Sequence, residues 1–214
     1  MSEARRARVV RADDPQAIPL ATSVLREGGL VVFPTDTVYG VGAAVDRPEA
    51  VARIYLVKGR PLDRPIPVLI SSLDQIERLV TRVDERVRRL AEAFWPGALT
   101  IVLPAQDWLP EEIVRDTGAV GLRMPDHLVA LAVIEASGGA LATTSANRSG
   151  EKEACTAEEA LEALGDRVEL IIDGGRSPGG VPSTVVAVAD DSLRILRVGA
   201  LDPELAERVY RGES

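Results

Sequence analysis

Short apolar segments recur along this chain, and they restrict it to a fold built around a β-sheet. Each one ends at glycine, proline or polar residues, and their length suits strands better than helices. They cover residues 30–33, 67–70, 99–103, 119–122, 140–142, 168–172, 184–188 and 193–196. We predict a strand in each of them.

Helical patterns separate most of these segments. Asp14-Pro15, followed by apolar residues at helical spacing and by Gly28-Gly29, predicts a capped helix with a glycine stop. Asp46 and Pro48 predict the start of a second helix, and Ser72 is predicted to cap a third that ends near residue 80. Further helices are expected over residues 84–94, 128–136, 157–164 and 203–210.

Strands and helices alternate without a strict βαβ rhythm. We therefore expect an α/β fold in which helices flank a mixed sheet, with a wide cleft. The length of 214 residues suits a single domain over residues 1–214, with its core at about 15–200. The longest clearly apolar run, residues 128–134, is far shorter than the ~20 residues that cross a bilayer, so we expect a cytoplasmic protein without membrane contact.

The charge balance bears on the class of partner. Lysine and arginine total 25 against 33 acidic residues, a formal net charge of −8. This argues against charge-driven coating of nucleic acid and favours a small-molecule enzyme, although a local basic groove stays open. A basic helix face at Arg82, Arg86 and Arg89 is expected to be solvated rather than RNA-binding.

Two polar segments follow predicted strands, where α/β sheets bind ligands. Residues 34–40 place two hydroxyls, a carboxylate and a phenol after the strand at 30–33, and a hydrogen-bonded turn is the competing interpretation. Residues 143–150 contain Ser145 and Asn147, which point the same way if the chain is extended. Asn147 is the only asparagine, which favours a functional role over an ordinary turn.

Cations and glycines mark two other segments. Lys58 and Arg60 flank a glycine at the end of the second helix and can converge on a polyanion such as triphosphate, although cations also suit a helix C-terminus. Lysine occurs elsewhere only at Lys152, which favours function. The glycines of residues 173–184 permit close approach to phosphate, but a flexible loop explains them equally well.

Several familiar catalytic patterns do not occur in the sequence. It contains no GxxxxGK[ST] phosphate loop. His127 is the only histidine, which disfavours a histidine-rich metal site, and we expect it at the surface or as a helix cap. The single cysteine, Cys155, excludes an internal disulfide and is expected to be inert. We predict no protein metal centre.

Taken together, the polar segments resemble the YrdC/Sua5 family, the threonylcarbamoyl-adenylate synthases. The matching motifs occur in the family's order and extend over nearly the whole chain. They are residues 33–40, 58–61, 94–97 with 99–100, 123–125, 145–147 with 149–150, 173–175, 183–186 and 196–197. The resemblance implies a twisted sheet around a large, positively lined cavity.

The resemblance also implies an activity: ATP, bicarbonate and L-threonine give threonylcarbamoyl-AMP and pyrophosphate, for t6A modification at position 37 of tRNA. It implies catalytic roles for Lys58 and Arg60, with Mg²⁺ carried by the nucleotide. The implied ATP-binding residues are Lys58, Arg60, Ser145, Asn147 and Arg197, and the implied threonine-binding residues are Thr35, Arg123, Thr143 and Ser183. Implied partners are other proteins of the t6A pathway and tRNA itself.

The sequence departs from the family pattern at a few positions. Arg64 replaces Asn or Lys, Leu69 replaces the His of the longer Sua5 type, Thr143-Thr144 replaces Ala-Pro, and Pro182 replaces an acidic residue. The sequence ends soon after Arg197, so we expect the short, single-domain type. Two rival readings are a double-stranded RNA-binding or tRNA-binding module and a relative that forms a carbamoyl-adenylate without threonine.

Overall fold

The structure is a computed structural model that describes residues 6–178, 181–189 and 192–213. Its strands are β1 (Arg8–Arg11), β2 (Val31–Phe33), β3 (Gly40–Ala44), β4 (Val68–Ile70), β5 (Leu99–Pro104), β6 (Ala119–Arg123), β7 (Ala140–Ser145), β8 (Leu170–Asp173), β9 (Thr184–Ala189) and β10 (Ser192–Arg197). They form one ten-stranded sheet in the order β1-β8-β2-β3-β7-β4-β6-β5-β9-β10. Parallel and antiparallel pairs alternate irregularly, so the predicted mixed sheet is confirmed.

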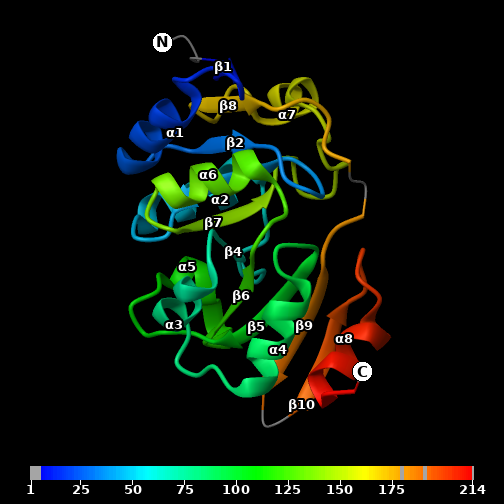
Figure 1. Cartoon of the computed structure of the whole chain (residues 1–214). Coiled ribbons are helices and arrows are strands. Elements are labelled where there is room, and N and C mark those ends of the chain that lie inside the picture. The colour runs from blue at the N-terminus through cyan, green and yellow to red at the C-terminus, as the bar shows by residue number, and fades with distance from the viewer. Residues whose placement is uncertain (1–5, 179–180, 190–191, 214) are drawn as a thin grey trace.

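The helices cover both faces of this sheet (Figure 1). They are α1 (Ala17–Arg26), α2 (Pro48–Lys58), α3 (Ile76–Leu79), α4 (Glu85–Phe94), α5 (Glu111–Val114), α6 (Leu128–Ala136), α7 (Ala157–Leu164) and α8 (Pro203–Arg211). In β2, Val31 and Phe33 pack in the cluster that contains α1 and α6, whereas Val32 packs in the cluster that contains α2. A strand covered on both faces is apolar throughout, which explains its uninterrupted hydrophobic run.

Each of the predicted strands is present, but two strands escaped the sequence analysis. β1 is an edge strand whose residues are mostly exposed, so it lacks an apolar signal. β3 is rich in glycine and alanine, which have low strand propensity, and its position between β2 and β7 imposes the conformation. A Cβ atom at Gly40 would lie 2.9 Å from Thr143 Cγ2, so this pairing requires a small residue.

Some predicted helix caps are wrong. Asp14 accepts the Gln16 N–H at 2.8 Å and closes a turn ahead of the helix, so α1 starts only at Ala17. Neither Ser72 nor His127 caps a helix with its side chain. Pro48 begins α2 as predicted, but Arg47 occupies the N-cap position and its side chain makes no cap bond.

Other sequence expectations meet mixed outcomes. Cys155 is buried and free. On the basic face, Arg82 is exposed, whereas Arg86 and Arg89 are half-buried. Arg86 pairs with Asp84 at 3.1 Å, and Arg89 donates to the Tyr210 carbonyl at 3.0 Å. In the described ranges we find no helix with the length and apolar character needed to cross a membrane.

Tyr39 ties together the loops that border the candidate site. Its hydroxyl donates to the Gly175 carbonyl at 2.6 Å and accepts the Gly174 N–H at 3.2 Å. Its backbone N–H donates to Ala154 and its carbonyl accepts from Ala146. Burial raises the pKa of Tyr39 to about 12, so the phenol keeps its proton as a donor. One buried residue therefore connects three loops, one through its side chain and two through its backbone.

We expect Tyr39→Phe to lower the unfolding free energy by about 1–3 kcal/mol, because two part-buried hydrogen bonds to the backbone are lost, each contributing about 0.5–1.5 kcal/mol. Tyr210→Phe is the matched control, since the Tyr210 hydroxyl is buried without a hydrogen-bond partner among the described residues. Urea unfolding of both variants measures the difference. Equal stability of the two variants would contradict the role given to Tyr39.

Candidate active site

A cavity of about 670 Å³ lies where the polar segments of the sequence meet. Its wall contains every residue of the predicted ATP and threonine sets. They are Thr35, Lys58, Arg60, Arg123, Thr143, Ser145, Asn147, Ser183 and Arg197. The positions where the sequence departs from the family pattern, Arg64, Leu69, Thr143-Thr144 and Pro182, also line it.

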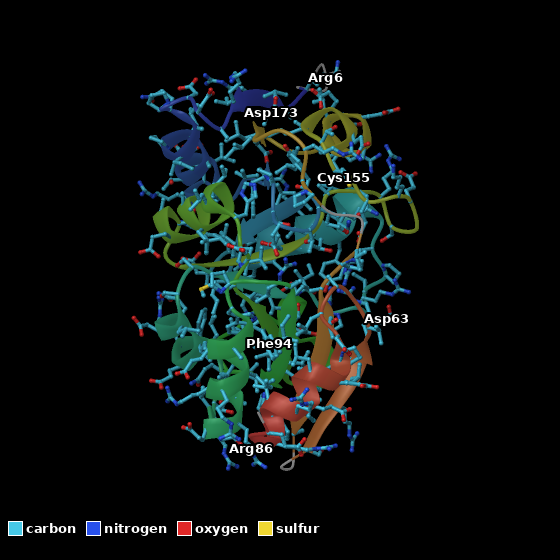
Figure 2. All side chains as sticks on the ribbon, turned by 45° about the vertical axis from the view of Figure 1, so that its right-hand side comes forward. Arg6, Asp63, Arg86, Phe94, Cys155 and Asp173 are labelled. Atoms are coloured by element: carbon cyan, nitrogen blue, oxygen red, sulfur yellow. The ribbon has the colours of Figure 1, made fainter. Side chains whose placement is uncertain are left out.

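The cavity lies between the two ends of the molecule. Figure 1 shows β1, β8 and β2 at one end and β5, β9 and β10 at the other. Asp63, in the turn after Arg60, and Cys155, just beyond the loop at residues 147–153, lie toward the same side in Figure 2. Segments from both ends of the sheet thus line one cavity.

Lys58 is the most buried cation of this wall, with 4% of its surface exposed. It is the last residue of α2, and Gly59 follows it in the left-handed conformation (φ 60°) that ends the helix. The Lys58 ammonium donates to the Ser145 carbonyl, to the Asn147 carbonyl at 2.6 Å and to Asn147 Oδ1 at 3.0 Å. All three of its N–H groups therefore hold the loop that carries Ser145 and Asn147.

Two opposing effects act on the protonation of Lys58. Burial and the nearby charge of Arg60 lower the pKa of Lys58 to about 7, and Glu153 raises it slightly. The three oxygen atoms around Nζ favour the ammonium form, which alone supplies three donors. The site is therefore ready to take an anion that would stabilise this charge further.

The SxN segment is internally ordered. The Ser145 hydroxyl donates to Asn147 Oδ1 at 2.6 Å, and the Asn147 amide nitrogen donates to the carbonyls of Arg148 and Glu151 at 3.0 and 2.8 Å. Every polar atom of the Asn147 side chain is thus used within the loop. The two side chains are in contact, although β7 ends at Ser145 and the segment does not stay extended as far as Asn147.

Arg60 and Arg64 line the cavity from the turn after α2. The Arg60 guanidinium donates to the carbonyls of Arg64 and Pro65 at 3.1 and 2.8 Å, which closes this turn. Burial lowers the pKa of Arg60, and the charges of Arg64 and Arg197 lower it further. Positive charge from three guanidinium groups is thus concentrated at one side of the cavity.

Arg123 lies at the end of β6 and is 7% exposed. Its guanidinium donates to Gly97 O at 2.9 Å, to Thr37 Oγ1 at 3.1 Å and to Asp36 Oδ1 at 2.7 Å. Two of its five N–H groups are left over for a ligand. Asp36 and Thr37 were not among the predicted site residues, although they lie in the polar segment 34–40.

The hydroxyl groups of Thr35 and Thr143 both donate hydrogen bonds to backbone carbonyls of the protein. Thr35 Oγ1 donates to the Val38 carbonyl at 2.6 Å and accepts the backbone N–H groups of Thr37 and Val38. Its side chain closes the turn between β2 and β3. Thr143 Oγ1 donates to the Leu141 carbonyl at 3.2 Å. Both residues line the cavity with hydroxyls that already have acceptors in the protein.

Ser183 connects the two predicted sets directly. Arg197 donates to the Ser183 carbonyl through Nε at 3.1 Å and Nη2 at 2.8 Å, and through Nη2 to Ser183 Oγ at 3.2 Å. Thr100 Oγ1 lies 2.8 Å from Ser183 Oγ. Burial lowers the pKa of Arg197, the charge of Arg123 lowers it further, and Glu153 raises it.

Sequence comparison decides the family. The model of the Sua5_yciO_yrdC family, described as "Telomere recombination", matches residues 23–199. The chain belongs to this family. It is 43% identical over 198 residues to the threonylcarbamoyl-AMP synthase of Bacillus subtilis, covering 92% of this chain and 57% of that protein. It is 40% identical to a putative threonylcarbamoyl-AMP synthase of Mycobacterium tuberculosis H37Rv over 88% of this chain and 87% of that one.

Solved structures of family members share the fold. The Pyrococcus abyssi Sua5 complexed with L-threonine superposes with a TM-score of 0.86 at 42% identity, covering 90% of this chain and 56% of that one. Escherichia coli YciO superposes with a TM-score of 0.81 at 29% identity, covering 91% and 95%. The chain thus spans little more than half the length of the B. subtilis and P. abyssi proteins, but nearly all of YciO.

We expect Lys58 to make the stability of this family member depend on pH. Its folded pKa of about 7 lies below the ordinary 10.5, so between these values the unfolded chain binds the additional proton. The contribution of Lys58 to the unfolding free energy is therefore lowest below pH 7 and rises with pH, by up to about 1.4 kcal/mol per pH unit.

Urea unfolding of the wild type and of Lys58→Met, from pH 7 upward, measures this slope. The wild type should gain stability relative to the variant as the pH rises. Lys152→Met is the control, since Lys152 is exposed and should leave the slope unchanged. Parallel stability curves for the wild type and Lys58→Met would contradict the lowered pKa.

Proposed function

We propose that this protein forms threonylcarbamoyl-AMP from L-threonine, bicarbonate and ATP, with release of pyrophosphate. The supporting observation is that one cavity unites a cationic side, Lys58, Arg60 and Arg197, with a hydroxyl-rich side around Arg123. Its relatives are named as synthases of this product, and one family structure contains L-threonine. The product would serve the t6A modification at position 37 of tRNA, in the cytoplasm, together with other proteins of that pathway.

In this proposal the two sides bind different anions. Arg123, with Asp36 fixing its orientation, offers its two remaining N–H groups to the threonine carboxylate. Ser183, Thr143 and the turn closed by Thr35 complete the threonine side. Lys58, Arg60 and Arg197, with the ordered loop of Ser145 and Asn147, bind the triphosphate.

The chemistry proceeds in two balanced steps. The neutral amine of threonine attacks the carbon of bicarbonate, so that an N–C bond forms, a C–O bond breaks, and a carbamate and water result. The additional proton that threonine carries as an ammonium ion passes to solvent beforehand. A carbamate oxygen then attacks the α-phosphorus of ATP, the new O–P bond forms, and the bond from that phosphorus to the α,β-bridging oxygen breaks to release pyrophosphate. Because the carbamate is already an anion, positioning and charge stabilisation supply the catalysis. Positioning contributes about 7–11 kcal/mol to lowering a barrier, and each preorganised hydrogen-bond donor contributes about 3–4 kcal/mol.

We also propose that Mg²⁺ enters on the nucleotide. Glu151 and Glu153 line the cavity near the cationic side, and magnesium is commonly held by one or two carboxylates together with substrate phosphates. The donor set therefore suits an ion that arrives with ATP and, when bound, neutralises charge on the phosphates.

The first test is a product assay with ATP, bicarbonate and threonine. We expect pyrophosphate release that depends on threonine, and an adenylate with the mass of threonylcarbamoyl-AMP. Omission of threonine is the control, and serine in its place tests selectivity. ATP turnover without threonine would favour the carbamoyl-adenylate reading, and tight binding of structured RNA without turnover would favour the RNA-binding module.

A second test addresses Lys58. We expect Lys58→Ala to lower turnover by at least about 100-fold, as the loss of a group that stabilises charge in the transition state does. Threonine binding should change much less, because Lys58 lies on the phosphate side. Lys152→Ala, at the only other lysine, should behave as the wild type in steady-state assays. Near-normal turnover of Lys58→Ala would remove it from the catalytic set.

A further inference from the structure

Thr100 is a buried cavity residue outside the proposed binding sets. It lies in β5, which pairs in parallel with β9, and Ser183 immediately precedes β9. The side chains of Thr100 and Ser183 are both 5% exposed, and their hydroxyl oxygens are 2.8 Å apart. The sheet register thus sets this contact between two hydroxyls in the cavity wall.

A bound anion determines which hydroxyl donates. In the free protein either hydroxyl oxygen could be the donor of this contact. When an anionic oxygen accepts the Ser183 proton, donation from Thr100 to Ser183 gives both hydroxyl protons an acceptor, whereas the reverse direction leaves the anion without a donor at Ser183. In the ligand-bound state Thr100 therefore donates to Ser183.

The second donor to Ser183 is Arg197 Nη2, at 3.2 Å. A serine oxygen accepts two hydrogen bonds and donates one. With Thr100 and Arg197 as donors, both lone pairs of Ser183 are occupied and only its proton stays available. The positive charge of Arg197 also polarises this hydroxyl, which strengthens it as a donor.

We propose that Thr100 is a positioning residue that, together with Arg197, fixes the Ser183 hydroxyl as a hydrogen-bond donor to an anionic oxygen of the bound amino acid. The inference rests on the proposed function, because it assigns threonine to the side of the cavity that contains Ser183. Without the Thr100 hydroxyl, the Ser183 hydroxyl is free to rotate and can also act as an acceptor. A hydroxyl that presents a lone pair to an anion does not stabilise that anion.

The test compares L-threonine affinities by calorimetry, a readout that does not require adenylate formation. Thr100→Val removes the hydroxyl and keeps the methyl group Cγ2. This methyl group packs against Gly121, since a Cβ atom added at Gly121 would lie 3.1 Å from it. We expect its Kd for threonine to rise about tenfold, the effect of weakening one hydrogen bond to an anion. ATP affinity should stay within about twofold of the wild type. Thr100→Ser should restore threonine binding.

Thr184→Val is the matched control. Thr184 is the next residue after Ser183 and fully buried, but its hydroxyl donates to the Leu201 carbonyl at 2.5 Å and accepts the Gly199 N–H at 2.9 Å, outside the cavity wall. A valine there loses buried hydrogen bonds without touching Ser183. We expect it to lower the melting temperature while threonine affinity stays unchanged.

A double variant separates positioning from general damage. If Thr100 acts through Ser183, then Thr100→Val should add no further loss of affinity in a Ser183→Ala background. Independent, multiplying losses would overturn the inference, as would equal affinity losses in Thr100→Val and Thr184→Val or failure of Thr100→Ser to rescue.

The outcomes for the two proposals are distinguishable. Product formation by the wild type with unchanged threonine affinity in Thr100→Val would overturn the role of Thr100 and leave the synthase function intact. Threonine binding that depends on Thr100, without any adenylate product, would do the reverse. A wild-type protein that binds no threonine would overturn both.

Discussion

Cations that face one cavity repel each other, and the way this protein offsets that repulsion organises the rest of the site. Lys58 donates to the carbonyls of Ser145 and Asn147, Arg60 to those of Arg64 and Pro65, and Arg197 to that of Ser183. Carbonyl dipoles hold a cation without cancelling its charge, whereas a carboxylate would neutralise it. The wall therefore keeps a positive field for an incoming anion. Arg123, paired with Asp36, is the exception and lies on the side proposed for threonine.

The same hydrogen bonds determine the loop conformations. Because each cation binds carbonyls from a loop, the order of the loop and the position of the charge depend on each other. Lys58 at the end of α2 fixes the loop after β7, and Tyr39 fixes that loop against residues 173–175. Removal of one such side chain thus changes both the charge and the shape of the site.

Sequence reasoning predicted the parts of this arrangement that leave a local signal. The mixed sheet followed from apolar segments, and the rarity of lysine and asparagine pointed to Lys58 and Asn147, which the structure brings into contact. The acceptors of the cations were not predictable, because any residue has a carbonyl and only the fold decides which ones converge. The contact of Thr100 with Ser183 depends on the register of β5 and β9, which no local pattern encodes. Strand β3 was missed because pairing with its neighbours overrides weak local propensity.

The composition of the cavity wall also bears on which reactions it suits. Among the described residues that line it there is no histidine or cysteine, and Lys58, Arg60, Arg123 and Arg197 each donate to acceptors within the protein. Such a wall is well equipped to hold two anions close together. A carbamate needs no base to become a nucleophile, and its reaction with a phosphate requires charge compensation above all. The proposed chemistry thus matches what the site can do, namely to reduce the repulsion between a nucleophile and an electrophile of the same charge.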